Sequence, residues 1–123
     1  CSSTRDLSSR MAHRDLNVLD AAERAAEGVN RLIDRSRRRL LYRAQLRDSA
    51  QAIGALIAEG FGRKKGPDRA YRLVVARGEA EETIRHLKSN FNVARIGPGM
   101  YWPLHNLLVT IIKMLDSLIR SME

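Results

Sequence analysis

The chain has 123 residues, of which 44% are hydrophobic and only 5% aromatic, and its formal net charge at pH 7 is +8. This length fits one ordinary domain, and a composition poor in Pro, Val and Thr but rich in Ala, Leu, Arg and Glu favours an all-α chain over a β-rich one. The single cysteine, Cys1, excludes an intramolecular disulfide and agrees with the reducing cytoplasm, where we expect the protein to act.

Residues 1–14 are predicted to form a polar leader ahead of the folded domain. Cys1-Ser2-Ser3 is similar to the start of a mature bacterial lipoprotein, whereas Met11 offers a native start that would make residues 1–10 a leader or an addition to the chain. The sequence leaves both interpretations open. We expect the folded domain to occupy residues 15–123.

The first predicted helix covers residues 15–34. Its apolar positions follow one another at spacings of three or four: Leu16, Leu19, Ala22, Ala26, Val29 and Ile33. The second predicted helix covers residues 38–63, and its stripe consists of Leu46, Ala50, Ile53, Ile57 and Phe61. Leu40, Leu41 and Ala44 lie opposite that stripe at 100° per residue. Either this helix starts later, or these residues form a second apolar contact with another subunit.

The third predicted helix covers residues 67–92 and opens at Pro67, a residue favoured in a first turn. Its stripe consists of Leu73, Ala76, Ala80, Ile84, Leu87 and Phe91. Arg77 falls close to this stripe. Because a buried guanidinium is costly unless it is paired, we expect a carboxylate from another helix beside it.

The fourth predicted helix covers residues 100–122, with Pro103 in its first turn. A near-heptad seam runs along it: Leu104, Leu107, Leu108, Ile111, Leu115, Leu118 and Met122. Four helices of similar length with short connections predict a single up-down-up-down antiparallel four-helix bundle. The longest apolar run, residues 107–112, is far too short to cross a bilayer, so we expect no membrane span.

The sequence lacks the patterns of common catalytic and metal sites. Glu59-Gly60-Phe61-Gly62 has neither the spacing nor the preceding strand of a phosphate-binding P-loop, and indicates the end of a helix. No Glu has a His three residues later, as di-metal bundles require, so we expect surface or loop positions for His13, His86 and His105. Cys1 is terminal, and no Ser–His pairing can be argued from spacing. We therefore expect no metal, no cofactor and no enzymatic activity.

Positive charge is concentrated in residues 31–65, which hold ten of the 22 Lys and Arg but only three of the 14 Asp and Glu. Eighteen of the cations are Arg, whose forked donors fit phosphate. We expect two groups of cations to crowd at one end of the bundle and to contact nucleic acid. The first group is Arg35, Arg37, Arg38, Arg39, Arg43 and Arg47, and the second is Arg63, Lys64, Lys65, Arg69 and Arg72.

Glu59 and Arg63 are four residues apart, in the order that favours an ion pair within one helix. With Ala52 and Leu56 they form a strip well away from the apolar stripe. The strip is either a solvated helix face or a surface that meets a neighbouring subunit.

Several short motifs resemble one known family. Gln45-Leu46, Ser49-Ala50, IAEGFGR at residues 57–63, Ala76-Arg77-Gly78 and Glu82 are similar to the four-helix-bundle family encoded in intervening sequences of bacterial large-subunit ribosomal RNA genes. That family includes Avd, the accessory variability determinant of diversity-generating retroelements. The resemblance covers roughly residues 16–122, and it implies structural or inter-subunit roles for Glu59, Gly60, Arg63, Arg77, Gly78 and Glu82.

The chain departs from the family pattern at three places. Leu56 stands where Asn is usual, Glu79 stands where Ser is usual, and the basic segment at residues 35–39 replaces a Leu-Pro loop. The resemblance nevertheless implies a pentameric ring or barrel of bundles. For Avd-like members it also implies a basic surface that binds nucleic acid, and a reverse transcriptase as partner.

Two functions follow as alternatives. The first is a non-enzymatic, oligomeric accessory protein that binds RNA or DNA through its basic surface with little sequence preference, because phosphate contacts dominate such binding. The second is a structural or scaffolding oligomer of the ribosomal RNA intervening-sequence type, on whose arginine-rich surface a protein partner docks.

Overall fold

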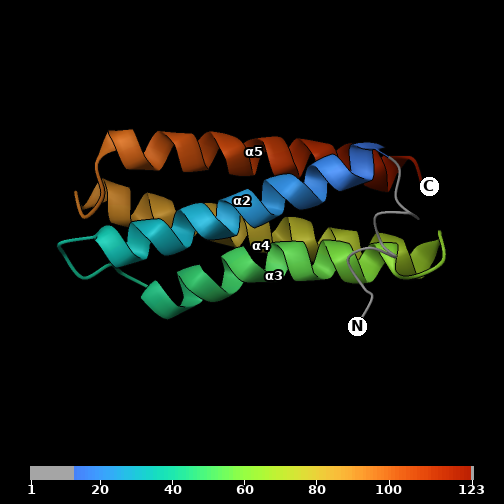
Figure 1. Ribbon diagram of the computed structural model, residues 1–123, viewed down its shortest axis with the longest axis horizontal. Coiled ribbons are helices and arrows are strands. Elements are labelled where there is room, and N and C mark those ends of the chain that lie inside the picture. The colour runs from blue at the N-terminus through green and yellow to red at the C-terminus, as the bar shows by residue number, and fades with distance from the viewer. Residues whose placement is uncertain (1–12, 123) are drawn as a thin grey trace.

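The computed structural model describes residues 13–122, which form a single bundle of four long helices (Figure 1). The helices are α2 (His13–Arg35), α3 (Arg43–Phe61), α4 (Pro67–Asn92) and α5 (Pro98–Arg120). Successive helices run in opposite directions, so the predicted up-down-up-down four-helix bundle is confirmed. The predicted leader lies outside the described residues except for His13 and Arg14, which begin α2.

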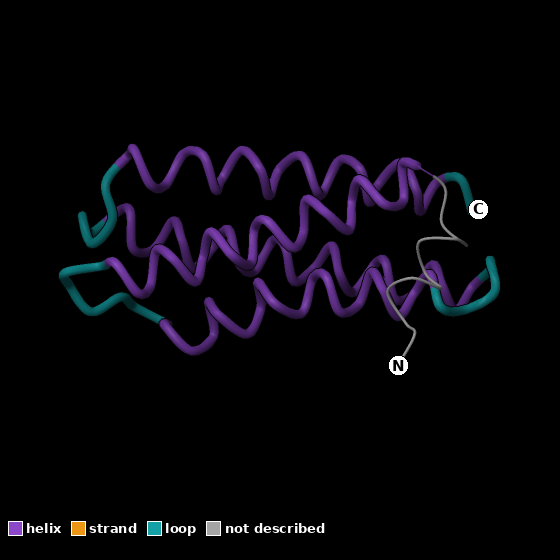
Figure 2. The backbone as a smooth tube through the Cα atoms, viewed as in Figure 1, coloured by secondary structure: helices purple, strands orange, loops and turns teal. Residues whose placement is uncertain are grey.

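Each helix packs against two neighbours around a common core. The contacting pairs are α2 with α3, α3 with α4, α4 with α5, and α5 with α2. The loops α2–α3 and α4–α5 lie at one end of the bundle, and the α3–α4 loop lies at the other (Figure 2). Two connections far apart in sequence therefore share one end.

The buried side of α2 is rotated from the predicted stripe. Leu16, Leu19 and Ala26 are only half-buried, and the buried residues are Val18, Ala21, Ala22, Ala25, Val29, Leu32 and Ile33. Small apolar residues occur on two sides of this helix, so periodicity alone is compatible with either. Packing against α3 and α5 together selects the side that carries Val18 and Leu32.

Helix α3 begins at Arg43, five residues later than predicted. The preceding residue, Tyr42, adopts a left-handed conformation (φ 54°, ψ 37°), which a right-handed helix cannot continue through. Leu40 belongs to the loop between α2 and α3, and its side chain is buried in the core, whereas Ala44 is exposed. Of the two alternatives for these residues, the later helix start is therefore correct.

The core stripe of α4 includes two polar residues. Thr83 and Asn90 are fully buried, whereas the predicted Ile84 and Phe91 are half-buried. The Thr83 hydroxyl lies 2.8 Å from the hydroxyl of Ser49 on α3 and also donates to the Glu79 carbonyl at 2.8 Å. Local hydrogen bonds satisfy these polar groups, which removes the main cost of burying them.

Helix α5 begins at Pro98, two residues earlier than predicted, so Pro103 lies beyond the first turn rather than within it. Pro103 has no N–H to donate to the carbonyl of the preceding turn, but a proline this close to the helix start removes only one bond of the ladder. Most of the predicted seam is buried, with Leu107 and Met122 half-buried.

Arg77 has the carboxylate partner that the sequence predicted. Its Nε lies 2.5 Å from Asp116 Oδ1 on α5, and its Nη1 lies 3.1 Å from Glu81. The hydrogen bond to Asp116 raises the pKa of Arg77 against the opposing effect of burial. In the following turn, burial raises the pKa of Glu79, and the nearby charge of Glu82 raises it further.

Within residues 13–122, no helix combines the length and apolar character needed to cross a bilayer.

Candidate nucleic-acid interface

The two predicted groups of cations lie at opposite ends of the bundle. The first follows α2 and opens α3, and the second follows α3 and opens α4 (Figure 1). The 19 residues of α3 separate them by about 28 Å at 1.5 Å per residue. The expectation of a single cationic end is therefore wrong, because α3 runs the full length of the bundle between the two groups.

Most cations of the second group are engaged in holding the α3–α4 corner. Arg63 lies 3.5 Å from Asp68, and Arg72 lies 3.8 Å from both Asp68 and Glu59. Arg69 donates to the carbonyls of Gly60 and Arg63 at 3.1 and 2.5 Å. Lys64 and Lys65 form no ion pair within residues 13–122. We expected Glu59 to pair with Arg63, but α3 ends at Phe61, so Arg63 no longer follows the helical spacing and Arg72 takes its place.

The first group is largely free of such partners. Only Arg47 in this group forms an ion pair among the described residues, with Asp34 at 3.5 Å. The other five, all exposed, are Arg35, Arg37, Arg38, Arg39 and Arg43. Charge that is not neutralised within the chain is available to an external anion.

Two adjoining hollows lie among these arginines. The larger, which we call the arginine basin, has a volume of about 750 Å³, and its lining includes Arg39, Tyr42, Arg43, Arg47, Asp48 and Arg95. The second, of about 490 Å³, shares Arg39 and Arg43 with the basin and adds Arg37 and Arg38. The basic surface therefore continues from one hollow to the next, as a polymeric anion requires.

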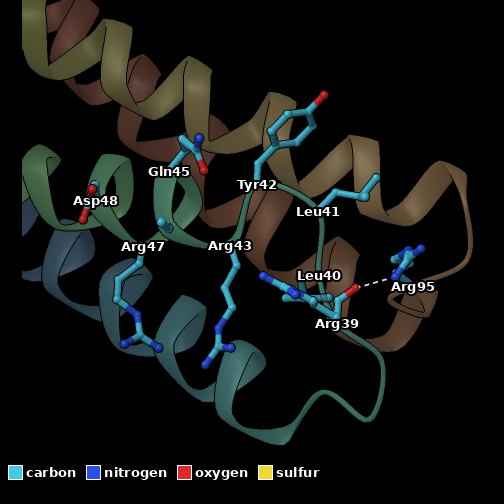
Figure 3. A pocket seen from close by; sticks show the side chains of 10 residues that line it. Arg39, Leu40, Leu41, Tyr42, Arg43, Gln45, Arg47, Asp48 and Arg95 are labelled. Atoms are coloured by element: carbon cyan, nitrogen blue, oxygen red, sulfur yellow. Dashed lines mark hydrogen bonds between the residues drawn. The ribbon is translucent and has the colours of Figure 1, made fainter.

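The side chains around the basin come from three segments (Figure 3). Tyr42 and Gln45 lie on the side toward α4, Arg43 and Arg47 extend on the side toward α2, and Arg39 lies near Arg95 of the α4–α5 loop. Arg95 Nη1 donates to the Arg39 carbonyl at 2.6 Å, which ties the two loops at this end together. The first turn of α3 contains no acidic residue, so the positive end of the helix dipole adds to the field of the arginines.

Asn90 fixes the chain where it enters the basin. Its Oδ1 accepts a hydrogen bond from the Leu41 N–H at 2.7 Å, and its Nδ2 donates to the Leu41 carbonyl at 3.0 Å. Nδ2 also donates to the His86 carbonyl at 2.8 Å. A side chain from α4 thus binds both backbone groups of Leu41 and holds Tyr42, the next residue, in place.

The family-motif residues have structural surroundings of different kinds. A Cβ added to Gly60 would lie 3.3 Å from Leu73, so this glycine allows α3 and α4 to approach closely. Around Gly78, by contrast, nothing lies within 4 Å of an added Cβ. Glu82 Oε1 lies 3.4 Å from His86 Nε2 on the same helix. Within residues 13–122, no three His, Cys, Asp or Glu side chains are grouped as metal ligands.

Sequence reasoning missed three residues of this interface. Tyr42 falls inside a predicted helix, the sequence predicts no role for Asn90, and Arg95 lies 48 residues from Arg47 in the sequence. Asn90 had one usable signal, since it continues the core spacing of Thr83 and Leu87, and a polar residue in a core stripe calls for a partner.

Comparisons with known proteins agree with this architecture. The sequence matches the family model of the 23S rRNA-intervening sequence protein over residues 14–117. The structure is similar to that of a protein from Bacteroides thetaiotaomicron VPI-5482, described as a protein with unknown function from the S23 ribosomal protein family. The two chains are 24% identical with a TM-score of 0.80, over 87% of this chain and 98% of the other, which is a likeness of fold. No protein of curated function matches the sequence.

Proposed function

Since the chain belongs to the 23S rRNA-intervening sequence protein family, we propose that it is a non-enzymatic, oligomeric accessory protein that binds RNA or DNA at the arginine basin. One observation carries the proposal: Arg37, Arg38, Arg39 and Arg43 line two adjoining hollows and form no ion pair within residues 13–122. Phosphate is the anion whose geometry suits several forked guanidinium groups side by side.

Binding of this kind follows the backbone of the nucleic acid and has little preference for sequence. The resemblance to Avd-like proteins suggests that the bound strand is presented to a reverse transcriptase, in the cytoplasm. The same arginines could also receive an acidic protein partner of a scaffolding oligomer, and this alternative is separated from the first by experiment.

The proposal is tested by measuring the affinity of the purified protein for labelled RNA and DNA over a series of salt concentrations. We expect the logarithm of the affinity to fall linearly with the logarithm of the salt concentration, because each neutralised phosphate releases counterions. An affinity that stays flat would reject phosphate-driven binding. Partners retained from nuclease-treated extract, together with a flat salt response, would favour the scaffolding role instead.

The oligomeric part of the proposal is supported by an outward strip on α4. Tyr71, Val74 and Gly78 follow one another at spacings of three and four, so they lie on one side of the helix. Tyr71 is 65% exposed and Val74 is 50% exposed. A glycine inside a helix costs about 1 kcal/mol relative to alanine, and no contact within the described chain requires it at position 78. A second copy of the chain packed closely against this strip would require a residue without a side chain at position 78.

Gly78→Gln is expected to break the assembly while leaving the single chain at least as stable as before. The added side chain would occupy the space of the neighbouring copy, whereas glutamine is the better helix former. Light scattering after size exclusion measures the mass, and thermal melting measures the stability. Thr110→Gln, at an exposed position of α5, is the matched control. Oligomers of unchanged mass for Gly78→Gln would contradict this interface.

A further inference from the structure

Tyr42 is an aromatic residue in an unusual position. Its backbone is left-handed, which costs a bulky residue on the order of 1–3 kcal/mol and is tolerated only where the surrounding structure enforces it. The side chain nevertheless remains 53% exposed, so this conformation is not needed to bury the ring. Strained residues of this kind occur preferentially where a ligand is held.

We propose that Tyr42 is a stacking platform for one unpaired base, so the nucleic acid bound in the arginine basin is a single strand. This inference rests on the proposed function and specifies its ligand. The Tyr42 ring packs against His86 on the α4 side, with ring centroids 5.2 Å apart. Tyr42 is part of the lining of the basin, and the residue remains more than half exposed.

The basin places phosphate-binding groups around the proposed base. Arg43 and Arg47 extend on the side of the basin opposite Tyr42, and Arg39 and Arg95 lie at its loop end (Figure 3). A volume of about 750 Å³ accommodates a nucleotide, with its base on the tyrosine and its flanking phosphates toward the arginines. Gln45 lies on the same side as Tyr42, where its amide could bond to a base edge. Asp48 is the carboxylate in the lining and opposes phosphate at that point.

Base stacking separates a single strand from a duplex. In a duplex every base is already stacked between its neighbours, so none is free to stack on Tyr42. In a single strand each base offers a π-face, and stacking on an aromatic side chain strengthens binding without sequence preference. The arginines alone bind either form, so a preference for single strands isolates the contribution of Tyr42.

The experiment compares three probes at one salt concentration: a labelled single-stranded oligonucleotide, a duplex of the same sequence, and an abasic strand with the same number of phosphates. RNA and DNA versions of the single strand are both used. The variants are Tyr42→Phe, which keeps a ring, and Tyr42→Leu, which keeps apolar bulk without one. Circular dichroism melting confirms that each variant is folded.

We expect the wild-type protein to bind the single strand about tenfold more tightly than the abasic strand. Tyr42→Phe should keep this ratio, and Tyr42→Leu should bring it close to one while leaving affinity for the abasic strand unchanged. Equal binding of the two strands by the wild type, or an unchanged ratio in Tyr42→Leu, would overturn the stacking role and leave the basin as a phosphate site. Failure of all three probes to bind would overturn the proposed function as well.

Discussion

Replacing Arg39 and Arg43 together by Gln is expected to weaken binding of a single-stranded oligonucleotide at least tenfold. Both side chains are shared by the two hollows, and neither forms an ion pair within residues 13–122. The hydrogen bond from Arg95 reaches the backbone carbonyl of Arg39, so the substitution leaves that bond in place. Two lost phosphate contacts should also reduce the slope of log affinity against log salt by roughly 1.4, at about 0.7 per contact for a single strand.

Lys64→Gln with Lys65→Gln is the matched control for this variant. It removes the same charge from the opposite end of the bundle, where both lysines are exposed. Fluorescence anisotropy at several salt concentrations gives affinity and slope for both variants. Equal losses in the two double variants would show that net charge, rather than the arginine basin, drives binding.

Asn90→Ala is expected to lower the free energy of unfolding by about 2–3 kcal/mol. The truncated side chain would leave the Leu41 N–H and carbonyl without their partner, and an unsatisfied buried polar group costs about 1–3 kcal/mol. Asn90 is fully buried, so a cavity adds to the loss. Urea denaturation monitored by circular dichroism measures the change.

Asn92→Ala is the control, because Asn92 is an exposed asparagine of the same helix. We expect it to change the unfolding free energy by less than about 0.5 kcal/mol. A folded Asn90→Ala protein should also lose much of its preference for single strands, since Tyr42 is no longer held in place. An Asn90→Ala variant as stable as the control would show that the hydrogen bonds between Asn90 and Leu41 do not stabilise the fold.

The bundle could be predicted because all four segments carry apolar residues at spacings of three and four, and because glycine and proline mark the starts of α4 and α5. Gly66-Pro67 set the start of α4 correctly, and Gly97-Pro98 bracket the start of α5. The family was identified from short motifs, and the match over residues 14–117 confirms it. The pairing of Arg77 followed from the cost of burying an unpaired guanidinium, although its partner, Asp116, could not be named from spacing.

The start of α3 could not be predicted from propensity. Residues 38–42 contain no glycine or proline, and Leu40 and Leu41 are good helix formers. The helix nevertheless begins at Arg43, because burial of Leu40 and the hydrogen bonds from Asn90 to Leu41 hold the preceding residues in a non-helical conformation. Tertiary contacts override local helix preference here. The resulting loop helps to form the arginine basin, of which the sequence indicated only a basic segment.

The positions of the cations along the sequence do not indicate which of them lie beside a carboxylate in the fold. Counting charges in residues 31–65 joined two groups that α3 keeps about 28 Å apart. Charge counts also do not distinguish Arg63 and Arg72, which pair with Asp68 and Glu59, from the arginines of the basin that form no ion pair among the described residues. That distinction depends on which carboxylates lie nearby in space, and it moves the candidate site from two clusters to one.

Amide hydrogen exchange with and without a single-stranded oligonucleotide tests the location of the site most directly. The two loops, residues 36–42 and 62–66, lie outside the helices, so protection of their amides by a ligand is easy to detect. We expect the bound strand to slow exchange in residues 36–42 and around Arg95, with residues 62–66 unchanged. Protection confined to residues 62–66, or none in either loop under conditions where the strand is bound, would contradict nucleic-acid binding at the arginine basin.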